Sequence, residues 1–141
     1  MPVELIRRCN TMEECYEYML AYAAQGVSSG DGSQSGGRIR EILQRAADSL
    51  SGLTDACTSM VTDGALEPAS KYLAFFAVID RDARDALAAI ELVLTQPAIN
   101  SQIVDNLNAS VHLRALLTDL FLLTDCAKQH TARMAMVRLP G

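Results

Sequence analysis

A cysteine and a histidine near the C-terminal end of the chain have the types and the spacing of metal ligands. Cys126 and His130 are four residues apart, so on a helix they share one face. Cys57, on another predicted helix, could add a third ligand, because zinc prefers thiolate sulfur and imidazole nitrogen. If the two helices run parallel, however, Cys57 lies level with about residue 119, roughly 10 Å short of Cys126. The sequence therefore predicts no metal and no cofactor, and a Cys/His metal protein using these three residues remains an alternative.

Nucleophiles paired with a base are the second kind of chemistry considered. His112 and Ser110 are two residues apart, and residues with that spacing do not face each other on a helix. Cys9 follows Arg7 and Arg8, whose positive charges would lower the pKa of the thiol and make it reactive. The competing interpretation is that Cys9, like the other three cysteines, is a small apolar side chain in the core. No residue is predicted to be catalytic.

Carboxylates and glycines argue against two further classes of site. A di-iron bundle needs inward glutamates and Glu-x-x-His motifs, whereas the carboxylates of the predicted helices fall on outward positions and the motif does not occur. The Gly/Ser-rich stretch 27–37 lacks the G-x-x-x-x-G-K-[ST] spacing of a phosphate loop and follows a helix instead of a strand. We interpret it as a flexible loop, and the sequence favours a protein that is not an enzyme.

Three apolar seams predict the helices that carry these residues. The seams span residues 39–60, 72–93 and 109–137, and their apolar residues recur in steps of three and four. An average step of 3.5 is typical of helices packed at shallow angles in a bundle. With a shorter helix before them, the predicted helices cover residues 12–25, 38–62, 68–95 and 101–137.

Local signals predict where these helices begin and end. Thr11 with Glu14 fits a capping box, and Gly26 fits a C-terminal stop. Asn100 fits an N-cap, whereas Gly52 is interpreted as an outward position within one continuous helix because the seam keeps its register across it. Short links join antiparallel neighbours. The chain is therefore predicted to be all-α, a single domain over residues 1–141, folded as an up-down-up-down four-helix bundle with a long C-terminal helix.

The last predicted helix has too much length and too much apolar surface for a simple bundle. It would span roughly 55 Å, against roughly 37 to 42 Å for the two helices before it, so we expect it to bend or to project. Its outward side chains include Val104, Leu107, Val111, Leu117, Phe121 and Leu122. A monomer seldom leaves such a patch exposed, so these residues predict a partner surface, most simply a two-fold homodimer. The alternative is that the first helix or the N-terminal segment covers it, although the first helix is too short to cover it all.

Composition limits the remaining possibilities. The chain has 141 residues, half of them apolar, and a net charge of −5. An acidic chain lacks the clustered Lys and Arg that bind phosphate, so no nucleic-acid partner is expected. The sequence has no apolar stretch near the roughly 18 residues of a membrane span, and its start does not resemble a secretory signal. We therefore expect a cytoplasmic protein with reduced thiols and no membrane partner.

Three hypotheses of function follow. The first is a non-enzymatic interaction protein of the adaptor, chaperone or regulator type, a homodimer that docks a partner helix on the apolar surface of its C-terminal helix. The second is a small-molecule carrier or sensor with a pocket between the helices. The residues predicted to line that pocket are Met19, Met60, Phe75, Phe76 and Leu120. The third is the metal protein described above.

Overall fold

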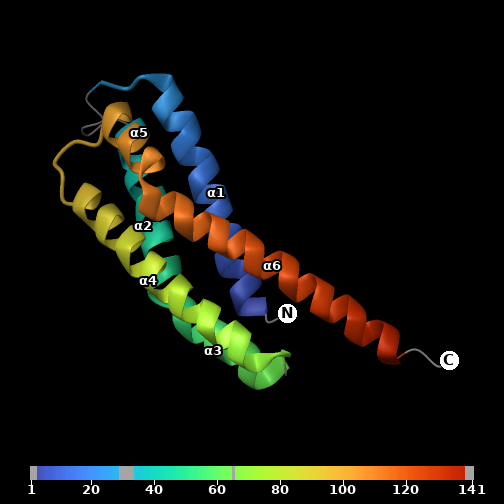
Figure 1. Cartoon of the computed structure of the whole chain (residues 1–141). Coiled ribbons are helices and arrows are strands. Elements are labelled where there is room, and N and C mark those ends of the chain that lie inside the picture. Colours follow the sequence, from blue (N-terminus) through green and yellow to red (C-terminus); the bar gives the residue numbers. More distant parts are fainter. Residues whose placement is uncertain (1–2, 29–33, 65, 139–141) are drawn as a thin grey trace.

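The chain is all-helical in the computed structural model, which describes residues 3–28, 34–64 and 66–138. Helix makes up 89% of the structure, and there is no strand among the described residues. The helices are α1 (Val3–Gln25), α2 (Gln34–Ser51), α3 (Leu53–Gly64), α4 (Ala69–Leu94), α5 (Ser101–Ala109) and α6 (Val111–Arg138) (Figure 1). The all-α prediction is confirmed. The up-down-up-down four-helix bundle is not confirmed, because the second and the fourth predicted helix are each divided in two.

The first helix starts earlier than the sequence indicated. Thr11 lies inside α1 and its hydroxyl donates a hydrogen bond to the backbone oxygen of Arg7 at 2.9 Å, so the capping box is wrong. Glu4 pairs with Arg7 and Arg8 one turn further on, at 2.7 Å in each case. Such i,i+3 and i,i+4 pairs support the extra turns of helix. The predicted stop is confirmed, since Gly26 has φ of 68°, a conformation that glycine adopts without steric cost.

Gly52 separates α2 from α3, so the continuous helix predicted there is wrong. The guanidinium of Arg8 lies against this position, and Nη1 donates to the backbone oxygens of Asp48 at 3.2 Å and Ser49 at 2.8 Å. A Cβ atom on residue 52 would lie 2.5 Å from Nη2 of Arg8. Glycine therefore makes room for an arginine from α1 that satisfies carbonyls at the end of α2.

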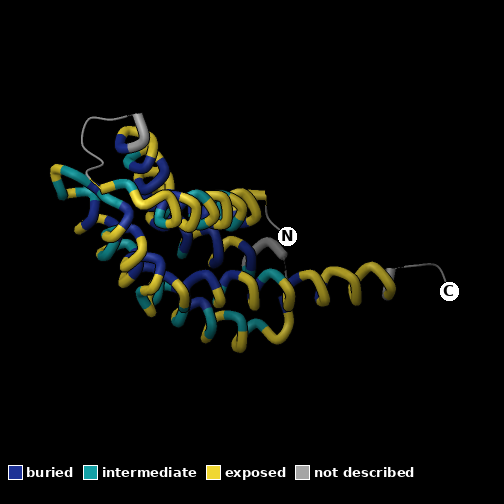
Figure 2. Tube along the Cα trace, turned by 90° about the horizontal axis from the view of Figure 1, so that it is seen from above, coloured by how far each residue is buried: buried dark blue, intermediate teal, exposed yellow. Residues whose placement is uncertain are grey.

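A second break, at Ser110, separates α5 from α6. Asn100 caps α5 as predicted, because its side-chain oxygen accepts a hydrogen bond from the backbone nitrogen of Ile103 at 2.9 Å. Ser110 leaves the helical conformation, with ψ of 138°, and its hydroxyl accepts from the backbone nitrogen of Leu113 at 3.4 Å. The long helix therefore bends, and its C-terminal end also projects beyond the other helices (Figures 1 and 2).

The predicted seams form the core between the helices. α1 packs against α2 and α5, and α4 packs against α6, α2 and α3. All the residues of the first seam are buried, and the other two are buried except at their ends. Tyr72 is half-buried, whereas Ala109 and Met134 are exposed, and the side chain of Val137 lies outside the described residues. The predicted loop 27–37 is partly helical, since α2 starts at Gln34, and residues 29–33 lie outside the described part of the chain.

Polar contacts close the end of the molecule where α1 meets α5. The hydroxyl of Tyr22 donates to the backbone oxygen of Ile99 at 2.6 Å. The hydroxyl of Ser101 donates to the backbone oxygen of Tyr22 at 2.6 Å and accepts from the backbone nitrogen of Val27 at 2.7 Å. The backbone nitrogen of Ser101 in turn donates to the oxygen of Val27 at 2.9 Å. We call this set, Tyr22, Val27, Ile99 and Ser101, the closed end.

Candidate interaction surface

The six residues predicted to form a partner surface do not lie on one surface. Val104, Leu107 and Leu117 are buried, with exposed fractions of 0%, 4% and 5%. For these three the prediction is wrong, because the bend at Ser110 brings α5 under α1 and turns Leu117 toward the core. Val111, Phe121 and Leu122 are exposed, at 69%, 49% and 53%. The alternative, that the first helix covers the apolar surface, thus holds for α5 and not for the second half of α6.

Large apolar side chains are exposed along the last part of α6. Phe121 and Leu122 are followed by Met134 and Met136, which are 38% and 74% exposed. All residues from Thr131 to Met136 are exposed, as the yellow end of the helix in Figure 2 shows. We call the segment 118–136 of α6 the open end. Residues Met134 and Met136 belong to it and were not predicted, because Met134 was assigned to the buried seam.

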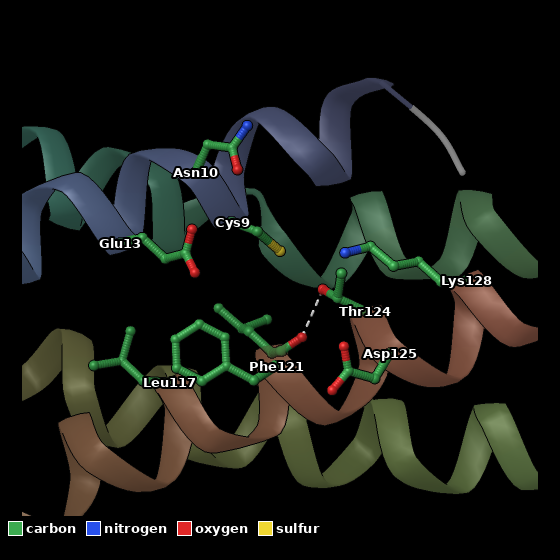
Figure 3. A pocket seen from close by; sticks show the side chains of 9 residues that line it. Cys9, Asn10, Glu13, Leu117, Phe121, Thr124, Asp125 and Lys128 are labelled. Atoms are coloured by element: carbon green, nitrogen blue, oxygen red, sulfur yellow. Dashed lines mark hydrogen bonds between the residues drawn. The ribbon is translucent and has the colours of Figure 1, made fainter.

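A cavity of about 220 Å³ lies between α1 and the open end (Figure 3). Its apolar wall includes Leu117, Leu120 and Phe121 from α6. The charged side chains around it are Glu13 from α1 with Asp125 and Lys128 from α6. None of these three forms a hydrogen bond or an ion pair with another described residue. The cavity thus combines an apolar wall with charges that are free to meet a partner.

Cys9 lines this cavity, but it is not the activated thiol considered above. Burial raises the pKa of its thiol, and a hydrogen bond with Thr124 offsets only part of that effect. Arg8 points toward α2 and Glu4, so it does not stabilise a thiolate at Cys9. A raised pKa lowers the fraction of reactive thiolate, which favours the other interpretation of Cys9, a small apolar side chain.

An apolar cavity of about 250 Å³ lies on the other side of α6, against α4. Its lining includes Tyr72, Phe75, Leu122 and Cys126. Of the five residues predicted to line a carrier pocket, Met19, Met60, Phe76 and Leu120 are buried and Phe75 is half-buried. None of the described cavities is lined by these five together. Both cavities beside α6 are also smaller than the roughly 300 Å³ at which small-molecule pockets begin.

The residues considered for zinc are not assembled into a site. Within residues 3–28, 34–64 and 66–138, no group of three or more Cys, His, Asp or Glu side chains could hold a metal ion. Cys57 is buried and burial raises the pKa of its thiol to about 12, whereas Cys126 is exposed. His130 is buried, and its Nδ1 lies 3.2 Å from Nη2 of Arg133.

Two carboxylates meet where α4 packs on α6. Burial, together with the neighbouring carboxylate of Asp82, raises the pKa of Asp119 to about 7. Oδ2 of Asp119 is buried and has no hydrogen-bond donor among the described residues. Two ionised carboxylates repel each other and can only accept hydrogen bonds, so the protonated form of Asp119 is favoured at this contact. Neither residue was singled out from the sequence, because each lies on an outward position of its own helix.

Comparison with models of protein families, with curated proteins and with solved structures finds no significant match. None of the described helices is both long and apolar enough to cross a membrane. The function must therefore be argued from the open end and the contacts around it.

Proposed function

We propose that this protein is a non-enzymatic interaction protein that forms a homodimer through the open end of α6. The observation that carries the proposal is the exposure of four large apolar side chains on one stretch of one helix, Phe121, Leu122, Met134 and Met136. Burying a large apolar side chain contributes about 1.5 to 3 kcal/mol, and half of that remains available where half of the side chain is exposed. Several large apolar side chains exposed on one helix are a feature that protein–protein interfaces often have.

The chemistry of the described residues supports the same proposal. Glu13, Asp125 and Lys128, which line the cavity beside the open end, form no ion pair with another described residue, and the thiols of Cys9 and Cys57 have raised pKa values. Aromatic side chains and methionine are enriched at protein interfaces, because they bury much area and adapt to a partner's shape. We further propose a cytoplasmic location, which the four free cysteines support, since unpaired thiols are typical of a reducing compartment.

Phe121→Asp tests the proposal directly. Sedimentation or native mass spectrometry should give twice the chain mass for the wild type and a single-chain mass for the variant. The helical circular dichroism should be retained, because Phe121 is half exposed and lies outside the buried seam of α6.

Leu92→Asp is the matched control. Leu92 is also a large exposed apolar residue, at 65%, but it lies at the far end of α4. This variant should keep the mass of the wild type. A wild-type protein that stays a single chain at every concentration would refute the homodimer.

A further inference from the structure

We propose that two copies pair through antiparallel α6 helices, so that Asp125 of each copy lies opposite the partner's Lys128. This inference rests on the proposed function and deepens it, because it names the occupant of the open end and its register. The two-fold axis would cross α6 between Cys126 and Ala127. The projecting end of each copy would then lie along the open end of the other.

A stripe of exposed residues on α6 has the spacing that such pairing needs. Its members are Thr118, Phe121, Asp125, Lys128, Ala132 and Ala135, and all six are exposed. They follow one another in steps of three and four, the average spacing that keeps one side of a helix against a partner helix. The buried seam of the same helix lies on a different side, so the stripe is free to pair without disturbing the core.

The stripe is complementary to itself when it is reversed. With Asp125 opposite the partner's Lys128, Phe121 lies opposite the partner's Ala132 and Thr118 opposite the partner's Ala135. Each bulkier side chain thus meets a small one, and each carboxylate meets an ammonium group. Two-fold symmetry makes every one of these contacts twice, as an isologous interface requires.

Charge favours a second copy over other occupants. Beyond Asp125 the chain holds Lys128, Arg133 and Arg138 and no acidic residue, although its net charge is −5. The projecting end of α6 is therefore basic while the rest of the chain is acidic. Glu13 and Asp125 line the cavity beside the open end, where the basic end of the partner would come to lie (Figure 3). Opposite charges across an interface favour one partner and one register.

Charge reversal tests the register. Asp125→Lys places two lysines opposite each other twice, and Lys128→Asp does the same with two aspartates. Each single variant should raise the dimer Kd about tenfold or more by sedimentation. The double variant Asp125→Lys/Lys128→Asp restores both opposite-charge contacts and should return the Kd to near the wild-type value. Glu91→Lys, an equal charge change at an exposed position of α4, is the control and should leave the Kd unchanged.

The outcomes separate this inference from the proposed function. Loss of the dimer in both single variants and its return in the double variant would support the antiparallel register. If Phe121→Asp abolishes the dimer but the charge reversals leave its Kd unchanged, the antiparallel register is overturned. The proposed function is then still supported. A double variant whose dimer Kd is as high as that of the single variants would also overturn the register. A wild type that never dimerises would overturn both.

Discussion

The closed end and the open end of this molecule differ in how far their polar groups are hydrogen-bonded and their apolar groups are buried. At the closed end, the side chains of Tyr22 and Ser101 satisfy backbone groups more than seventy residues away in the sequence, at 2.6 to 2.7 Å. Beside the open end, Glu13, Asp125 and Lys128 form no hydrogen bond or ion pair with another described residue, and Phe121 remains half exposed. Buried polar groups are almost always paired in folded proteins, so the closed end is complete in a single chain. Under the proposed function, a second molecule supplies comparable contacts to the open end.

Ser101→Ala is the largest expected effect and would break the closed end alone. The change leaves the backbone nitrogen of Val27 and the backbone oxygen of Tyr22 without their partner at a buried position. Each unsatisfied buried group costs about 1 to 3 kcal/mol, so we expect the free energy of unfolding to fall by about 2 to 4 kcal/mol. Urea denaturation measures it at a protein concentration where the assembly state is held constant.

Ser59→Ala serves as the control for that experiment. Ser59 is exposed on α3 and makes no hydrogen bond through its side chain, so its replacement should change stability by less than about 0.5 kcal/mol. Ser101→Ala should leave the dimer Kd unchanged. A variant that lost the dimer but kept its stability would mean that the two ends are not independent.

The raised pKa of Asp119 should make the free energy of unfolding depend on pH. The folded protein holds the proton of Asp119 up to a pKa of about 7, whereas an unfolded chain releases it near its ordinary value of 3.8. Between these values unfolding releases a proton, so this group's contribution is present in full below pH 3.8 and is lost as the pH rises through 7. We expect the wild type to lose on the order of 1 to 2 kcal/mol between about pH 5 and about pH 8, allowing for partial solvent screening.

Asp119→Asn isolates this contribution. The amide cannot ionise, and its nitrogen can donate a hydrogen bond to the carboxylate of Asp82. The variant should therefore show a flatter dependence of unfolding free energy on pH, with its largest gain over the wild type at the higher pH. Equal slopes for the two proteins would contradict the raised pKa of Asp119. Asp82 and Asp119 lie between α4 and α6. The same measurements therefore show whether the packing of α6 on α4 becomes less stable as the pH rises.

The helices could be predicted from the sequence because their signals are local. Apolar residues three and four apart mark the buried seams, and Asn100 and Gly26 mark helix ends through contacts within a few residues. The breaks could not be predicted in the same way. Gly52 is explained by Arg8, which lies more than forty residues earlier and contacts it only in the folded chain.

The partner surface was predicted only in part for a related reason. A helical pattern shows which residues share a side, but not where another helix covers that side. Ser110, a good N-cap residue, was a local sign of the bend that carries Val104 and Leu107 beneath α1. The raised pKa of Asp119 depends on how α4 and α6 pack, because Asp82 lies on the other helix, and neither helix encodes that packing alone.

The smallest expected effect is on the rates at which the four cysteines react with a disulfide reagent. Cys126 is exposed on α6, Cys9 is half-buried, and Cys15 and Cys57 are buried, with burial raising the pKa of the last three. A disulfide reagent at neutral pH should therefore modify one thiol rapidly and a second slowly, because thiolate fraction and access both govern the rate. Cys126→Ser should remove the rapid phase, and Cys9→Ser only the slow one. If Cys126 instead reacts as slowly as the buried thiols in dilute protein, then α6 is already covered within a single chain, and the contrast between the two ends is lost.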